Sequence, residues 1–312
     1  MMMKITFPWF GEDDSITIDH LSYLRGVHGI SATVRSFCSI CPLPGELLPA
    51  ESVSEMRDNA EACGYALEVL EDLPVHRDIK LRSGSFERYI DNYRENIARL
   101  SMAGIRNICY GFAPEPDDAF RTLGRDRLWE NLESFVREIL PVAQSNRVNM
   151  AFRFDEPFEP NSGIAGKERL IGDEVDIDRF LAFHGDPRHG IAMSGAAAGS
   201  SGFDAYLGMI NKYGTMDRIH YALLRDVRVS KDGSFTETAH CSPYDSGGMV
   251  RILTAYHEIG FGGCARYDHS RMNLSGEPNI GLYDRMVGTM YVTGILLTLA
   301  ARINVTPKEK IA

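Results

Sequence analysis

Asp268-His269 is the sharpest candidate for chemistry in this sequence, because the pair directly follows a short apolar run at residues 263–267. Neighbouring residues at the end of a strand point in different directions. In such a pair the aspartate can hold a cation, while the imidazole transfers a proton near neutral pH. Asp-His dipeptides also occur without a function, so the pair gains meaning only from the elements that position it.

Short apolar runs rich in β-forming residues alternate with amphipathic segments along the chain, which is the pattern of successive βα units. We predict eight strands, at residues 4–7, 29–34, 66–71, 107–112, 149–154, 190–194, 218–224 and 263–267. We predict eight helices, at residues 16–24, 53–63, 86–103, 127–145, 175–183, 203–213, 247–259 and 283–302. No linker rich in Pro, Gly or Ser divides them, so the sequence predicts an α/β fold, a (β/α)8 TIM barrel, with residues 1–312 as its single domain.

Active sites of this architecture lie at the carboxyl ends of the strands, so polar residues there are candidates for a site. In chain order they are Trp9, Glu71, His76, Tyr110, Arg153, Asp155, Glu156, Ser194, Arg225, Asp226, His240, Asp268, His269 and Arg271. Arginines bind carboxylates through paired hydrogen bonds, and carboxylates and imidazoles accept hydroxyl protons. The set favours a polyhydroxylated, anionic small molecule as ligand; the alternative is a structural network of salt bridges.

The composition excludes several classes of partner. The chain has 33 Lys and Arg against 43 Asp and Glu, a formal net charge of -10, and its basic residues are dispersed, so we expect no nucleic-acid partner. No run approaches the roughly 18 apolar residues of a membrane span, and the first residues do not resemble a signal peptide. We therefore expect a cytoplasmic protein with no membrane partner, whose six cysteines are free thiols.

Two short patterns have both a functional and a plain structural interpretation. Cys38 and Cys41 form a CxxC pattern, which occurs in redox and zinc sites, but no second CxxC or HxxxH follows it. The alternative is a loop with two thiols. The small-residue run at 195–202 can bind an anion through backbone N–H groups, or it is a turn, since it lacks the spacing of a standard phosphate loop.

Several segments together resemble the mannonate dehydratase family, in the same order along the chain. They are PWFG at 8–11, PVHRDIK at 74–80, YIDNY at 89–93, AGI at 103–105, CYGF at 109–112, DGSFTETAH at 232–240, GF at 260–261, DHSRM at 268–272 and GLYDR at 281–285. The resemblance covers nearly the whole chain and implies a xylose-isomerase-like TIM barrel. It further implies a homo-oligomeric enzyme of hexuronate degradation that dehydrates D-mannonate to 2-keto-3-deoxy-D-gluconate with a divalent metal, typically manganese.

The departures from this family fall on its metal ligands, which are a histidine, a cysteine, a histidine and an aspartate. The corresponding residues here are Arg153, Ser194, Leu223 and Asp268, so the aspartate is the only surviving ligand. Arginine and leucine offer no lone pair, and a neutral serine hydroxyl is a poor ligand. We therefore predict that the family's manganese is absent or relocated, in the latter case to a site built from Asp155, Glu156, His240 or Asp268.

His220 is the alternative ligand on the seventh predicted strand, three residues before Leu223. An odd offset reverses the side-chain face of a strand, so the two residues point into one pocket only if the strand contains a bulge. Ordinary manganese-dependent dehydration of mannonate depends on such a rearrangement.

The first functional hypothesis is a mannonate dehydratase-like lyase that acts on a sugar acid by proton abstraction and loss of water. His269 transfers the proton, Arg153 and Arg225 hold the carboxylate and the developing negative charge, and Asp268 orients Arg153, as an ion pair, or His269. The expected substrate-binding residues are Trp9, His76, Tyr110, Arg225, His240 and Arg271. The alternatives are a non-catalytic sugar-acid binding or regulatory protein and a sugar isomerase or epimerase, because a fold does not determine a function.

Overall fold

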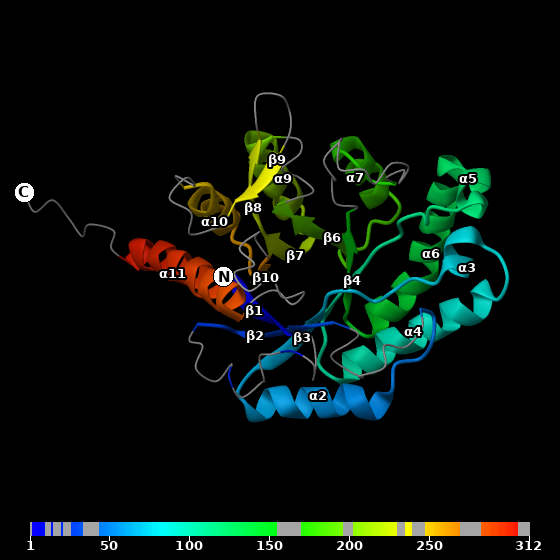
Figure 1. Ribbon diagram of the computed structural model, residues 1–312, viewed down its shortest axis with the longest axis horizontal. Coiled ribbons are helices and arrows are strands. Elements are labelled where there is room, and N and C mark those ends of the chain that lie inside the picture. Colours follow the sequence, from blue (N-terminus) through cyan, green and yellow to red (C-terminus); the bar gives the residue numbers. More distant parts are fainter. Residues whose placement is uncertain are drawn as a thin grey trace, which may run out of the picture.

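The computed structural model describes residues 2–9, 14, 20, 26–33, 44–154, 170–195, 202–229, 235–238, 247–268 and 282–304. Eight parallel strands close into a barrel in the order β1-β10-β7-β6-β5-β4-β3-β2 (Figure 1). They are β1 (Lys4–Trp9), β2 (Gly29–Ala32), β3 (Ala66–Leu70), β4 (Asn107–Tyr110), β5 (Asn149–Arg153), β6 (His189–Ser194), β7 (Ile219–Leu224) and β10 (Cys264–Tyr267). The predicted TIM barrel is confirmed.

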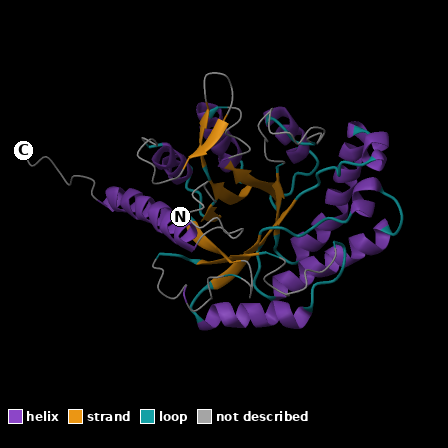
Figure 2. Cartoon of the chain, viewed as in Figure 1, coloured by secondary structure: helices purple, strands orange, loops and turns teal. Residues whose placement is uncertain are grey.

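The described helices lie around the outside of the barrel (Figure 2). They are α2 (Ala50–Ala62), α3 (Arg77–Leu81), α4 (Phe86–Met102), α5 (Asp118–Leu123), α6 (Arg125–Ser145), α7 (Glu174–Leu181), α9 (Phe203–Thr215), α10 (Gly248–Glu258) and α11 (Leu282–Asn304). The helix expected at 16–24 falls almost entirely outside the described residues. None of the described helices combines the length and the apolar character that a membrane span needs.

A small antiparallel sheet follows β7, and the sequence does not predict it. Its strands β8 (Asp226–Val229) and β9 (Phe235–Thr238) pair with each other and not with the barrel. The sheet occupies a βα loop, which is the place where TIM barrels carry additions near their sites.

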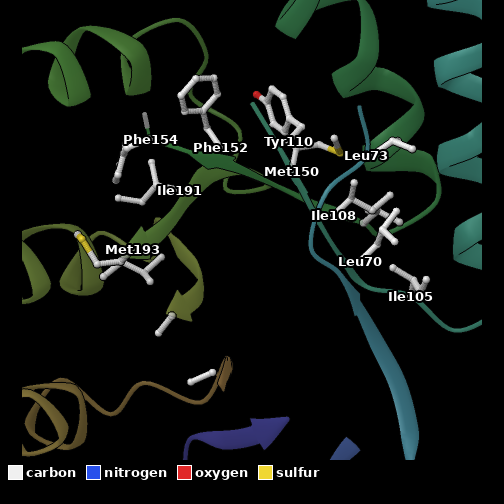
Figure 3. Close-up of a cluster of buried hydrophobic side chains, with 14 of the residues drawn as sticks. Leu70, Leu73, Ile105, Ile108, Tyr110, Met150, Phe152, Phe154, Ile191 and Met193 are labelled. Atoms are coloured by element: carbon white, nitrogen blue, oxygen red, sulfur yellow. The ribbon is translucent and has the colours of Figure 1, made fainter. Parts of the chain in front are cut away.

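Side-chain alternation along the strands creates two separate cores. Tyr110 and Phe152 point away from the barrel axis and pack against the helical layer (Figure 3). The ring of Tyr110 lies 5.9 Å from that of Phe135 on α6 and 5.4 Å from that of Phe152. Cys109, next to Tyr110, belongs instead to a separate, smaller cluster of buried residues inside the barrel. Burial on both faces explains why these strands are continuous apolar runs in the sequence.

A buried ion pair joins the last helix to the start of the chain. Both terminal nitrogens of Arg285, near the start of α11, contact the carboxylate of Asp14, at 2.7 and 2.6 Å. Arg285 also donates to the carbonyl oxygen of Pro8 on β1, at 2.9 Å. The Arg285 and Asp14 side chains are both 1% exposed. Such a two-point contact fixes α11 against the barrel wall.

Candidate active site

The inner face of the barrel changes from apolar to charged on the way to the carboxyl ends of the strands. The apolar layer consists of Val69, Cys109, Ala151, Ala192, Tyr221, Leu223 and Cys264. Side chains two residues apart on a strand point the same way. The next inward positions on these strands are Glu71, Arg153, Ser194, Arg225 and Arg266. Because side chains alternate along a strand, one carboxylate and three guanidinium groups point inward at the same end of the barrel.

Four buried charges form a chain across β3, β7 and β10 at this end. The Nε atom of Arg266 lies 2.6 Å from Oε1 of Glu71, and its Nη1 atom lies 2.7 Å from Oδ1 of Asp268. The other oxygen of Asp268, Oδ2, lies 2.9 Å from Nη2 of Arg225. All four residues are at most 5% exposed. Charges are buried at acceptable cost only when they are paired, and here each one lies beside a charge of opposite sign.

Burial and neighbouring charges determine the protonation states of Arg266 and Tyr221. Burial lowers the pKa of the Arg266 guanidinium, but the charges of Asp268 and Glu71 hold that pKa well above its ordinary value. Tyr221 donates its hydroxyl proton to Oε1 of Glu71 at 3.0 Å. Burial, and then the charge of Glu71, raise the pKa of Tyr221 well above its ordinary value. Arg266 is therefore a permanent cation, and Tyr221 is a neutral hydrogen-bond donor.

Arg153 ends β5 and stands apart from these pairs. Its side chain is partly buried. Burial raises the pKa of the Cys109 thiol, and the positive charge of Arg153 opposes that rise. Among the described residues, no carboxylate lies within 4.0 Å of the Arg153 guanidinium. A guanidinium in this position is able to bind an anionic ligand through two N–H groups.

The expected ion pair between Arg153 and Asp268 is not formed, which corrects the predicted role of Asp268 in orienting Arg153. The reason is that Arg225 and Arg266 contact the two oxygens of Asp268. Arg225 and Asp268 are both predicted candidates, and the structure brings them together. Arg266 is absent from the predicted set. The signal for it is its position on the strand two residues before Asp268, which directly follows that strand, since both side chains then face the barrel interior.

The four positions that the family resemblance assigns to metal ligands lie on, or directly after, neighbouring strands of the barrel. Leu223 pairs in register with Ser194 on one side and with Arg266 on the other. A divalent metal ion needs lone pairs from several side chains. Arg153 and Leu223 have none to offer, and Asp268 is engaged by two guanidinium groups whose charges repel a cation. These residues do not fit a manganese ion.

Within the part of the chain that the structure describes, no group of three or more His, Cys, Asp or Glu side chains is placed to hold an ion. Asp155, Glu156 and His240, which are predicted for a relocated site, lie outside the described residues. The hydroxyl of Ser194 is buried without a hydrogen-bond partner at the charged end of the barrel. A hydroxyl in this position is suited to a hydrogen bond with a polar ligand.

His220 lies toward the opposite end of the barrel. The pairing of β6 with β7 shifts by one residue at His220, between Ile219 and Tyr221. The bulge on which a ligand role for His220 depends is therefore present. His220, however, lines a cavity of about 470 Å³ together with Lys4, at the amino ends of the strands. Burial there lowers the pKa of His220 to about 3, and the ring does not reach the charged end.

Three residues predicted to bind substrate have other contacts in the structure. Tyr110 faces the helices and not the barrel interior (Figure 3). Trp9 is 7% exposed and belongs to the same buried cluster. His76 is the N-cap of α3, where its Nδ1 atom accepts from the backbone N–H of Asp78 at 3.0 Å, and its ring stacks on Tyr89 at 3.7 Å. The structure does not bring these three into the chain of buried charges.

Several predicted residues lie outside the described residues. They are Cys38, Cys41, Asp155, Glu156, His240, His269 and Arg271. The small-residue run at 195–202 is described only at its two ends. Their predicted roles remain predictions.

The described charges can do two things for an anionic ligand. Arg225 and Arg266 are held in place by Asp268, and cations fixed before the reaction stabilise negative charge that develops in a transition state. Arg153 is placed to bind a carboxylate. The arrangement thus suits a substrate that is already anionic and gains further negative charge as it reacts.

A family model described as D-mannonate dehydratase (UxuA) matches residues 3–118 and 115–305 of the chain. The chain is 30% identical to mannonate dehydratase 2 of Halalkalibacterium halodurans, over 94% of this chain and 98% of that protein. It is 29% identical to a mannonate dehydratase of Thermotoga neapolitana, over 94% of this chain and 97% of that protein. The crystal structure of mannonate dehydratase from Streptococcus suis serotype 2 is similar with a TM-score of 0.85 and 27% identity, covering 99% of this chain and 97% of that one.

More distant structures share the fold alone. An L-ribulose 3-epimerase is similar with a TM-score of 0.60 and 12% identity, covering 100% of both chains. The predicted xylose-isomerase-like architecture agrees with a further match to a xylose isomerase domain protein of Planctomyces limnophilus, with a TM-score of 0.59, 13% identity, and coverage of 96% of this chain and 97% of that one.

Proposed function

Because the chain belongs to the D-mannonate dehydratase family, which is a family of hydro-lyases, we propose that it removes water from an aldonate at the carboxyl end of its barrel. The proposed substrate is D-mannonate or a related sugar acid. The observation that carries the proposal is the gathering of Arg153, Arg225 and Arg266 at the charged end of the barrel. An aldonate has the carboxylate that such groups bind and the hydroxyls that accept and donate hydrogen bonds beside it.

Loss of water from an aldonate begins with removal of the proton next to the carboxylate. The carbanion that results is stabilised as an enediolate, which carries more negative charge on the carboxylate oxygens than the substrate does. Arg153 binds the carboxylate in this proposal, and the positive charges of Arg225 and Arg266 favour the enediolate over the substrate. His269, which follows Asp268 in the sequence, is the proposed proton-transfer residue.

Guanidinium groups take the place of the metal in this proposal. The family resemblance implies manganese, but the donors at the ligand positions do not fit it, as argued from Arg153, Leu223 and the engaged oxygens of Asp268. A fixed cation supplies the same kind of electrostatic stabilisation to an enediolate that a Lewis acid supplies.

A non-catalytic sugar-acid binding protein is the second candidate. The observation that favours it is the same replacement of metal ligands, because loss of a Lewis acid leaves a pocket that still binds carboxylates. Both candidates bind a sugar acid, but only the lyase converts it to product. A sugar isomerase or epimerase has only the shared fold in its favour.

The test is a dehydration assay on a panel of aldonates that includes D-mannonate, with detection of the 2-keto-3-deoxy product. We expect turnover of at least one of them, and Arg153→Ala to lower kcat/KM by 10²-fold or more, since one charge-assisted contact to a transition state contributes about that much. Arg153→Lys, which keeps the charge but not the planar fork, should lose less.

The matched control is Arg137→Ala on the outer face of α6, where the side chain is 62% exposed. It should leave kcat/KM unchanged. Thermal stabilisation by an aldonate without any turnover identifies the binding protein and refutes the lyase. Unchanged kcat/KM in Arg153→Ala refutes the role of that arginine.

A further inference from the structure

The barrel carries a second polar cavity, at the amino ends of its strands and away from the charged end. Its volume is about 470 Å³. Polar side chains and one thiol from six different strands line it, and we name them the amino-end ring: Lys4, Glu68, Asn107, Asn149, His220 and Cys264. The apolar layer of the barrel interior separates this cavity from the charged end, because the interior of a TIM barrel is a packed core and not a pore.

Two members of the amino-end ring, Glu68 and His220, are the extra residues of irregular strand pairings. The pairing of β3 with β2 skips Glu68, and the pairing of β7 with β6 skips His220. Val69 and Tyr221, the next residues on these strands, lie in the apolar layer inside the barrel. Regular alternation would therefore turn the two ring members towards the helices. A bulge re-aims a side chain, and here two bulges on separate strands direct polar side chains into one cavity.

The carboxylate of Glu68 already has its partners. Nζ of Lys4 lies 3.1 and 3.0 Å from its two oxygens, and Nε2 of His28 lies 2.9 Å from Oε1. The thiol of Cys264 donates to Oε2 at 3.4 Å. Burial raises the pKa of Glu68, but hydrogen bonds from His28 and Lys4 hold that pKa below its ordinary value. Glu68 is therefore an anion that Lys4 balances, and no bound cation is needed to compensate it.

The ring of His220 has a hydrogen-bonding position that the described residues leave unused. His220 is 7% exposed, and its Nε2 atom is buried without a partner. Burial, and then the positive charge of Arg218, lower the pKa of His220 to about 3, so the ring is neutral and has a single N–H. A hydrogen bond to the backbone of Pro187 uses that N–H, which leaves Nε2 as an acceptor.

Gly190 on β6 makes room for this ring inside the barrel. A Cβ atom at Gly190 would lie 2.4 Å from Nε2 of His220. Gly190 lies two residues before Ala192, which belongs to the apolar layer, so its side-chain position faces the interior. The His220 ring therefore occupies the space of a missing side chain inside the barrel.

Asn107 offers the complementary group, a donor without an acceptor. It is 7% exposed. Its Oδ1 atom accepts from Nδ2 of Asn149 at 3.0 Å, and Oδ1 of Asn149 accepts from Arg188 at 3.0 Å. The Nδ2 group of Asn107 has no acceptor among the described residues. Buried polar groups are normally hydrogen-bonded, so an unused donor and an unused acceptor in one cavity indicate a ligand that carries both.

The charges around the cavity favour a neutral ligand. Two cations, Lys4 and Arg106, and two anions, Glu68 and Asp217, line it, so the lining has no net charge. An ionised carboxylate has no proton to donate and would face the lone pair on Nε2 of His220. A hydroxyl group both donates and accepts, and it brings no charge.

We propose that the amino-end cavity binds a neutral polyhydroxylated molecule, a polyol or a monosaccharide, with one hydroxyl donating to Nε2 of His220 and another accepting from Nδ2 of Asn107. The volume lies at the lower end of the roughly 300–1,000 Å³ of ligand pockets, which suits a molecule of that size. Ile259 and Phe261 also line the cavity and supply the apolar surface that ligand pockets combine with a few polar groups. The proposal is independent of the proposed function, because it concerns the other end of the barrel.

Saturation-transfer difference NMR of the full chain, with D-mannitol, xylitol and D-mannose as probes, tests this proposal. We expect saturable binding of at least one probe, with a Kd on the order of 1–10 mM for so small and polar a ligand. His220→Phe and Asn107→Leu each remove one hydrogen bond at similar side-chain volume, and each should raise the Kd about tenfold. Asn59→Leu is the matched control, because Asn59 is an exposed residue on α2, and it should leave the Kd unchanged.

Two further variants keep the test decisive if a thermal melt shows that a buried substitution prevents folding. Arg106→Trp places a large ring at an exposed position of the cavity lining and should raise the Kd at least tenfold. Its control is Arg121→Trp on α5, where the side chain is 72% exposed, and it should bind as the wild type does. Arg153→Ala, at the charged end, should also leave the Kd of the probe unchanged.

Three results would overturn the proposal. The first is the absence of saturable binding of all three probes to the wild-type chain. The second is binding that Arg153→Ala abolishes and Asn107→Leu does not, which would place the probe at the charged end. The third is binding of inorganic phosphate, but of no neutral probe, that is lost in Asn107→Leu, which would identify an anion site.

Discussion

Replacement of Arg266 by methionine removes the centre of the chain of buried charges. The variant keeps an unbranched side chain but leaves Glu71 and Asp268 without the cation that lies 2.6 and 2.7 Å from them. Removal of one partner from a buried ion pair costs roughly 3–5 kcal/mol, because it leaves an uncompensated charge. Since Arg225 still contacts Asp268, we expect the lower end, about 3 kcal/mol.

The assay is equilibrium unfolding in urea at neutral pH, with a thermal melt as a second measurement. A loss of about 3 kcal/mol corresponds to a fall in Tm of about 5 °C for a chain of this length. The matched control is Arg251→Met, where the guanidinium lies 2.8 Å from Asp204 but both side chains are more than half exposed. An exposed pair contributes about 1 kcal/mol or less, so the control should stay near wild type.

A double variant shows whether the loss comes from the stranded carboxylate. Glu71→Gln in the Arg266→Met background removes the carboxylate charge that Arg266 had balanced, whereas Asp268 keeps its contact with Arg225, so part of the lost stability should return. An unfolding free energy of Arg266→Met equal to that of Arg251→Met would contradict the stabilising role of the buried charges. A further loss of stability on adding Glu71→Gln to Arg266→Met would contradict it as well.

The remaining predictions concern stability. Burial lowers the pKa of His220 to about 3, whereas an unfolded histidine titrates near 6.5, so the unfolded state binds an extra proton between these values. Stability should therefore fall from pH 6.5 downward by up to about 1.4 kcal/mol per pH unit from this residue, and urea unfolding of His220→Gln should lack that part of the slope. Arg285→Lys keeps the charge but loses the two-point contact with Asp14, and thermal unfolding should show a loss of about 2 kcal/mol; an unchanged melt contradicts this. Gly288→Ala should cost about 1–3 kcal/mol, because its methyl group meets a tyrosine ring. Gly294→Ala, on the same helix, should cost nothing or stabilise the fold by up to about 1 kcal/mol, because a Cβ atom there has no described atom within 4 Å; equal effects at the two glycines would contradict the packing around Gly288.

The barrel is predictable from the sequence because its strands are buried on both faces and stand out as apolar runs. Tyr110 shows what this pattern leaves open. Its place at the end of a strand suggests the barrel mouth, but alternation from Cys109, which lies inside, turns Tyr110 towards the helices. The pairing of the strands decides which of two adjacent residues faces inward. An apolar run alone does not specify this.

The sequence predicts which residues belong to the candidate site better than it predicts which of them contact one another. Arg225 and Asp268 follow their strands directly and are therefore visible in the sequence. Arg266 lies within a strand, where a charged residue is unusual, and its inward direction depends on the register of β10 with β7. The partner of Asp268 is set by that same register, which is why an ion pair with Arg153 is predicted from the sequence and a pair of contacts with Arg225 and Arg266 is found.

The most direct test of guanidinium groups in place of a metal is the initial rate of aldonate dehydration, measured after exhaustive chelation and again with added manganese. We predict equal rates in the two conditions, because the ligand positions hold Arg153 and Leu223 and both oxygens of Asp268 contact guanidinium groups. A rate that vanishes on chelation and returns with manganese would contradict the replacement of the metal by guanidinium groups.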